Sequence, residues 1–158
     1  MSKSPIQKIV PHFWYTKEAE EAARFYASVF PDSRVDRVTT LPAAGSTVVV
    51  EFTLFGQEFL AISAGPHDPF NDAVSFLVNC DTQAEIDRYW NAILDNGGQP
   101  QACGWITDKY GVRWQIAASA LRDMITDPDK TKAERVTKEF LTQVKVDIAK
   151  LEAAFEDR

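Results

Sequence analysis

The feature that most constrains the fold is an order of strand and helix patterns that occurs twice along the chain. Residues 9–15 are apolar and aromatic, as in a buried strand, and residues 18–30 carry apolar side chains at helical spacing. Three further strand patterns follow, at residues 35–41, 47–55 and 58–63. Residues 6–64 therefore predict a βαβββ module.

The second half repeats this order after a linker at residues 65–69 that is rich in Gly and Pro. Its strand patterns lie at residues 73–80, 103–107 and 112–118. Between the first two of these, Thr82 and Glu85 have the spacing of a capping box at the start of an amphipathic helix. Residues 72–120 therefore predict a second βαβββ module.

The two modules align at one offset of about 64 residues, which is the separation of Arg24 from Arg88 in the two helix segments. At this offset, the paired positions are Glu51 with Gln115 in the hairpin strands and Pro11 with Ser75 in the first strands. The alternative is a chance alignment, because few residues are identical. We expect a single α+β domain, residues 1–158, in which a pseudo-twofold axis relates the modules.

An amphipathic tail follows a break in the chain at residues 123–128. Its apolar residues recur every three or four positions: Val136, Phe140, Val144, Ile148, Leu151 and Phe155. Lysine and acidic residues alternate on the other face. This pattern predicts one C-terminal helix over residues 131–157. Such a helix could cover its own domain or contribute to a dimer interface, and the sequence leaves both alternatives open.

Charge and hydropathy exclude several classes of partner. The net charge of −6 and the lack of any basic stripe argue against nucleic acid, since phosphate binding needs clustered Lys and Arg. No apolar run has the length of a signal peptide or a membrane span, so we expect a cytoplasmic protein with no membrane partner. Cys80 and Cys103 form no CxxC pair, and each is predicted to be a small buried hydrophobe.

Three stretches of the sequence resemble the PhnB-like proteins. The opening resemblance comprises Ile9-Val10-Pro11-His12-Phe13-Trp14-Tyr15, residues 19–26 and Phe30-Pro31-Asp32-Ser33. The second comprises Gly104-Trp105, the turn Asp108-Lys109-Tyr110-Gly111 and Trp114-Gln115-Ile116, and the third is the tail at residues 145–154. That group belongs to the glyoxalase, bleomycin-resistance and dioxygenase superfamily, also called the vicinal-oxygen-chelate superfamily. Its members often carry the label 3-demethylubiquinone 3-methyltransferase-like.

The resemblance implies two cup-shaped sheets that face each other, a small-molecule ligand and a homodimer. Metal-binding members of the superfamily take one ligand from the first strand and one from the hairpin strand of each module. By the offset, these positions are Pro11, Ser75, Glu51 and Gln115. Proline has no donor and serine is a weak one, so we expect no tightly bound metal. If a divalent metal does bind, the candidate ligands are His12, Glu51 and Gln115, and His12 would reach the site through a bulge or through a one-residue error in the predicted register.

Glu51 is the candidate catalytic base, because its strand is otherwise apolar. A carboxylate that faces the cup would have a raised pKa, whereas the alternative is a glutamate exposed on the outer face or paired with a lysine. The candidate substrate-binding residues are His12, Trp14, Glu51, Ser75, Trp105 and Gln115. For the tryptophans, core packing is the alternative role.

Four functions remain open at this point. The first is a small-molecule binding protein or enzyme that works without a tight metal. The second is a metal-dependent lyase, isomerase or dioxygenase that uses Glu51 and Gln115. The third is non-catalytic sequestration of an aromatic or antibiotic-like compound, and the fourth is a dimeric structural module.

Overall fold

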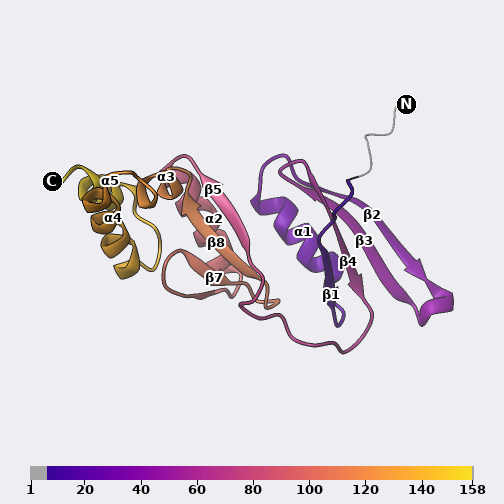
Figure 1. Ribbon diagram of the computed structural model, residues 1–158. Helices are drawn as coiled ribbons and strands as arrows, with labels where there is room; N and C mark the ends of the chain where they lie inside the picture. The colour runs from indigo at the N-terminus through magenta and orange to yellow at the C-terminus, as the bar shows by residue number, and fades with distance from the viewer. Residues whose placement is uncertain (1–6, 158) are drawn as a thin grey trace, which may run out of the picture. The chain divides into compact units, whose positions relative to one another are not determined.

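The structure is a computed structural model that describes residues 7–157 (Figure 1). The described residues divide after Asp68 into two compact units, which we call unit 1 and unit 2. The boundary lies within the predicted linker at residues 65–69. No helix among the described residues is both long enough and apolar enough to cross a membrane.

Unit 1 has the predicted βαβββ order. Its elements are β1 (His12–Tyr15), α1 (Ala19–Val29), β2 (Arg34–Leu41), a short 3-10 turn η1 (Pro42–Ala44), β3 (Thr47–Leu54) and β4 (Gln57–Ser63). The strands form one sheet in the order β1-β4-β3-β2, in which β1 pairs with β4 in parallel and the other pairs are antiparallel.

Alternating burial gives the sheet of unit 1 a covered face and an open face. In β1, Phe13 and Tyr15 are buried, whereas His12 and Trp14 are exposed. Helix α1 packs on the covered face, where the hydroxyl groups of Tyr15 and Tyr26 lie 3.1 Å apart and share a hydrogen bond. Because side chains alternate along a strand, the open face carries the other half of each strand's residues.

Unit 2 repeats the same order. Its elements are β5 (Phe76–Cys80), α2 (Gln83–Asp95), β6 (Gln99–Pro100), β7 (Trp105–Thr107) and β8 (Arg113–Ala118). The sheet order is β5-β8-β7-β6, and β5 pairs with β8 in parallel. The predicted capping box is confirmed, because Thr82 Oγ1 accepts from the Glu85 backbone N–H and the Glu85 carboxylate accepts from the Thr82 N–H. Both predicted modules and the α+β class are thus confirmed.

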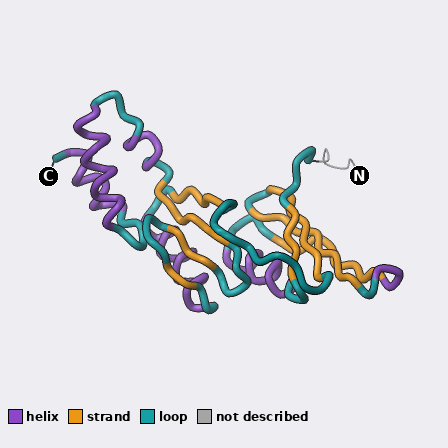
Figure 2. Tube along the Cα trace, turned by 60° about the horizontal axis from the view of Figure 1, so that its bottom comes forward, coloured by secondary structure: helices purple, strands orange, loops and turns teal. Residues whose placement is uncertain are grey.

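The C-terminal helical tail is present, but the prediction of one continuous helix over residues 131–157 is wrong. The chain forms α3 (Leu121–Ile125), α4 (Lys130–Thr142) and α5 (Ile148–Glu156), and α3 occupies part of the expected break at residues 123–128. Figure 2 shows α4 and α5 as separate coils joined by a loop. We call this loop, residues 143–147, the strap.

The strap is extended because unit 2 supplies partners for its backbone. The Cys103 N–H donates to the Gln143 carbonyl and the Gly104 N–H to the Val144 carbonyl, each at 2.8 Å. Val146 is fully buried, and Asp147 begins α5 by accepting from the Lys150 N–H. A continuous helix would satisfy the same carbonyls internally, but it would leave the two N–H groups of unit 2 without these bonds.

Candidate functional site

The open face of unit 1 brings three predicted site residues together. The strand registers align His12, Leu60, Glu51 and Arg37 in one row across the four strands. Trp14 lies in the next row of the same face, and its indole N–H donates to the Gly65 carbonyl at 3.0 Å. No bulge is needed to place His12 on this face.

Glu51 is an ion-paired carboxylate. Arg37, directly opposite on β2, donates to Glu51 Oε1 from Nε at 2.9 Å and also from Nη2. The side chain of Glu51 is 30% exposed and that of Arg37 is 66% exposed. The hydrogen bond and charge of Glu51 raise the pKa of Arg37. This geometry matches the ion-paired alternative for Glu51, and it does not favour a carboxylate held ready as a general base.

The open face of unit 2 also collects predicted residues. Leu77, Gln115 and Trp105 form one row across β5, β8 and β7. The Gln115 amide Nε2 donates to Ser75 Oγ at 2.7 Å, so two predicted ligand-binding residues contact each other directly. Trp114 points to the covered face, where it is buried.

The pairing of Glu51 with Gln115 at one offset is wrong. In the sheet orders, β8 takes in unit 2 the place that β4 takes in unit 1. By strand register, Gln115 corresponds to Leu60, and Glu51 corresponds to Trp105. The offset fails because the hairpin strands span residues 34–63 in unit 1 but only 99–118 in unit 2.

The offset fails in the first strands too. It pairs Phe13 with Leu77, yet Phe13 is 4% exposed on the covered face and Leu77 is 43% exposed on the open face. Side chains alternate between the two faces along a strand, so the even offset pairs residues on opposite faces. Only an odd offset pairs residues on the same face, and one such offset pairs His12 with Leu77. The predicted pairing of Pro11 with Ser75 is therefore wrong, and Pro11 precedes β1.

On unit 1, the candidate ligands His12 and Glu51 do not converge on one point. Leu60 separates His12 from Glu51 in their row, which puts the two backbones about 10 Å apart. The Glu51 carboxylate is already bound by Arg37. Among residues 7–157, no three His, Cys, Asp or Glu side chains form a group that could hold a metal ion.

Asp108 holds the hairpin that carries Gln115. It is 4% exposed, and its Oδ1 accepts from the backbone N–H groups of Tyr110 and Val112, each at 2.9 Å. Its Oδ2 accepts from Trp114 Nε1 at 2.9 Å. Three donors thus satisfy a buried carboxylate, which is the condition for burying one. Residues 108–111 were predicted only as a turn, because the donors that Asp108 accepts from are set by the folded hairpin.

A pocket of about 200 Å³ lies on unit 2, between its open face and the tail. Its lining residues are Leu77, Asn79, Cys103, Gln115, Ala117, Ala118, Leu121, Arg122, Ile125 and Phe140. Sequence reasoning found Gln115 but not the contribution of α3 and α4. The tail's apolar period indicated a helix but gave no sign of which surface it would meet.

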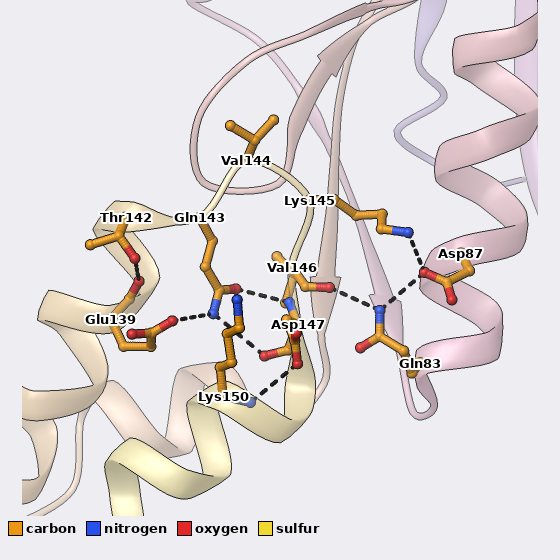
Figure 3. A pocket seen from close by; sticks show the side chains of 10 residues that line it. All are labelled: Gln83, Asp87, Glu139, Thr142, Gln143, Val144, Lys145, Val146, Asp147 and Lys150. Carbon is orange, nitrogen blue, oxygen red and sulfur yellow. Dashed lines mark hydrogen bonds and ion pairs between the residues drawn. The ribbon is translucent and has the colours of Figure 1, made fainter.

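A larger pocket of about 470 Å³ lies where α2 meets the strap and α4 (Figure 3). Its polar side chains largely bind one another or the strap's backbone. Gln83 donates to the Val146 carbonyl and accepts from the Ile148 N–H, and Lys145 pairs with Asp87 at 2.6 Å. The residues that line this pocket therefore form the contact between the tail and α2.

The two cysteines differ in accessibility. Cys80 is buried, as predicted, and burial raises the pKa of its thiol to about 12, with smaller contributions from Glu85 and Asp81. Cys103 is only half-buried and lines the 200 Å³ pocket. At pH 8 we expect iodoacetamide to label Cys103 and leave Cys80 unmodified, because alkylation requires an accessible thiolate. Intact mass should show one adduct on the native protein and two in urea; two adducts on the native protein would contradict the burial of Cys80.

Comparison with known proteins gives the family. The model of the 3-demethylubiquinone-9 3-methyltransferase family matches residues 7–117. The chain belongs to this family. A PhnB protein from Bacillus cereus is 33% identical, with 71% of this chain and 99% of that chain covered and a TM-score of 0.65. No curated protein matches the chain.

Two more distant structures share the fold. A protein from Pseudomonas aeruginosa is 20% identical over 72% of this chain and 98% of its own, with a TM-score of 0.60. The fosfomycin resistance protein FosX from Listeria monocytogenes is 11% identical over 74% and 94% of the two chains, with a TM-score of 0.59. The predicted PhnB-like resemblance is confirmed by the family model and the Bacillus cereus PhnB protein, and these two further structures show that the fold is shared.

The 3-demethylubiquinone-9 3-methyltransferase family takes its name from methyl transfer, but the fold is not that of a Rossmann-type methyltransferase. That fold needs a doubly wound parallel sheet with a Gly-rich turn after its first strand. Here each sheet is mixed, and Tyr15-Thr16-Lys17 follows the first strand without a glycine. The family match also ends at residue 117, so the whole tail lies beyond it.

Proposed function

We propose that the protein binds a small molecule on the open sheet faces and works without a tightly bound metal. The observation that carries this proposal is that one face of each sheet is packed by a helix while the other presents polar and aromatic side chains. On unit 1 these are His12 and Trp14, and on unit 2 they are Gln115 and Trp105. A concave apolar surface with a few polar groups is typical of ligand sites.

The same geometry favours binding over base catalysis at Glu51. The Arg37 guanidinium holds that carboxylate from two nitrogen atoms. Gln115 is neutral and, once tied to Ser75, keeps its carbonyl oxygen as a hydrogen-bond acceptor for a ligand. This supports a binding or sequestering protein more than a metal-dependent lyase, isomerase or dioxygenase, which would need His12, Glu51 and Gln115 as ligands.

The proposal includes a homodimer in the cytoplasm with no nucleic-acid partner. The acidic net charge of −6 supports the last point. Leu141 and Val144 in the tail are 64% and 50% exposed, which supports an interface between copies of the chain.

Native mass spectrometry of protein purified without chelators tests this function. We expect a dimer without a stoichiometric divalent ion and with a co-purified small adduct. Glu51→Gln should retain the adduct, because the pair with Arg37 is not a ligand contact, whereas Gln115→Ala should lose it. One divalent ion per chain would overturn the metal-free proposal. An adduct that the Gln115→Ala variant retains would overturn the proposed site.

A further inference from the structure

We propose that the 200 Å³ pocket between the open face of unit 2 and the tail binds a small apolar monocarboxylate, the size of a single ring with one acidic group. This inference rests on the proposed function and names the ligand class and the residue that selects it. The pocket belongs wholly to unit 2, so its geometry does not depend on unit 1.

The size of the pocket limits the ligand. A cavity of about 150 Å³ lined by aliphatic and aromatic side chains takes one benzene molecule. A pocket of about 200 Å³ therefore has room for a ring and one substituent. Its walls are mainly apolar, with Leu77 and Ala117 from the sheet, Leu121 and Ile125 from α3, and Phe140 from α4.

The charge of the pocket favours a ligand that carries an acidic group. Arg122 is the one ionised side chain among the ten lining residues at neutral pH. Within residues 7–157, every other arginine guanidinium has an ion pair or an aromatic contact, whereas Arg122 donates to no side chain, carbonyl or ring. A planar guanidinium binds a carboxylate through two parallel hydrogen bonds.

Two amides also line the pocket. Asn79 is exposed, and its side chain is bonded to no other described residue. Gln115 is fixed by Ser75 and retains an acceptor and a second N–H. With a single cation, the pocket has no second partner for a dianion such as a phosphate or a dicarboxylate, and this favours a monoanion.

The tail holds the outer wall in place. Cys103 Sγ contacts the Phe140 carbonyl at 3.8 Å, and the strap hydrogen bonds on Cys103 and Gly104 fix the end of α4 against the sheet. Because α3 and α4 lie beyond the residues that the family model matches, Arg122 and the wall formed by Ile125 and Phe140 come from the tail and not from the βαβββ modules.

Isothermal titration calorimetry of the full-length protein with sodium benzoate and benzamide tests the inference. The two probes share a shape and differ in charge. We expect benzoate to bind at least about tenfold more tightly than benzamide, since hydrogen bonds to charged groups are the stronger ones. Arg122→Gln should bring the two affinities within about twofold by weakening benzoate alone. Arg24→Gln, an exposed arginine of unit 1 that pairs with Glu20, is the matched control and should change neither affinity.

A second variant separates the wall from the charge. Ile125→Ala removes a wall group that is 39% exposed, so the fold should tolerate it, and it should weaken both probes by a similar factor. Wild-type protein that does not bind benzoate, or an Arg122→Gln variant that keeps the tenfold preference, would overturn the inference. Suppose that one of these two results is obtained and that Gln115→Ala still loses the co-purified adduct. The proposed ligand class is then wrong, and the proposed function stands. A stoichiometric metal would overturn the proposed function and leave the benzoate result readable.

Discussion

Replacing Asp108 with alanine is expected to lower the free energy of unfolding by about 3–5 kcal/mol. The substitution removes one buried carboxylate and leaves three N–H donors without their acceptor: those of Tyr110, Val112 and the Trp114 indole. Each buried donor without an acceptor costs about 1–3 kcal/mol. Water that enters the cavity left by the side chain can bind only some of these donors.

Urea unfolding followed by tryptophan fluorescence measures the effect. Asp72→Ala is the matched control, because that aspartate is 65% exposed and pairs with Arg113 of the same hairpin. An exposed ion pair contributes about 0–1 kcal/mol, so the control should unfold almost as the wild type does. If Asp108→Ala lost no more stability than Asp72→Ala, the hydrogen bonds described for Asp108 would not be the ones that hold the hairpin.

Gly104→Ala is the second substitution with a large expected effect. Gly104 has φ +76°, and an added Cβ would lie 2.6 Å from the Ile116 carbonyl oxygen and 2.9 Å from Val146 Cγ2. The positive φ alone costs about 1–2 kcal/mol. The contact with backbone adds about 1–3 kcal/mol, because neither the Ile116 carbonyl nor the buried Val146 can move without breaking packing.

We therefore expect a loss of about 2–5 kcal/mol, together with release of the strap. Gly45→Ala is the matched control, since Gly45 has φ +64° and nothing lies within 4 Å of its added Cβ. Hydrogen exchange should report faster exchange of the Cys103 and Gly104 amides in Gly104→Ala only. Equal losses of stability in the two variants would mean that φ accounts for the whole effect and that the strap contributes nothing.

Local patterns in the sequence predicted the local structure. Thr82 and Glu85 lie three apart before an apolar helix, and that spacing is sufficient for the reciprocal hydrogen bonds observed. The apolar and aromatic run at residues 9–15 likewise predicted the strand that forms β1. These features depend on neighbours within a few residues, which is why one sequence was enough to find them.

Features that depend on distant partners were not predictable in the same way. The apolar period of residues 131–157 runs through Val144, which suits a helix, yet the chain becomes extended to reach Cys103 and Gly104. The sequence did contain one sign that a new helix begins here, because Asp147 is a suitable N-cap for α5. The offset of about 64 residues held for the helices and failed for the strands, since loop length varies without changing the fold.

In the candidate site, too, local features were predictable and features that depend on distant partners were not. Ser75 and Gln115 were both predicted, and Gln115 Nε2 lies 2.7 Å from Ser75 Oγ; Gln115 lies in β8, and Ser75 directly precedes β5. Arg37 was not predicted as the partner of Glu51, because the pair is set by the register of β2 against β3. Arg122 became a candidate only when α3 and α4 were placed against the sheet.

The strap also sets the order in which a growing chain can complete its two units. The β1–β4 pairing of unit 1 is available once Ser63 has been synthesised, whereas the amides of Cys103 and Gly104 must wait for Gln143 and Val144. Val144 lies 40 residues after Gly104, so at about 5–20 residues per second these amides wait about 2–8 s. During that time the nascent second sheet has an edge with two unpaired N–H groups, which can pair with another chain. A segment synthesised later than this edge, the strap, is thus the part that protects it from aggregation.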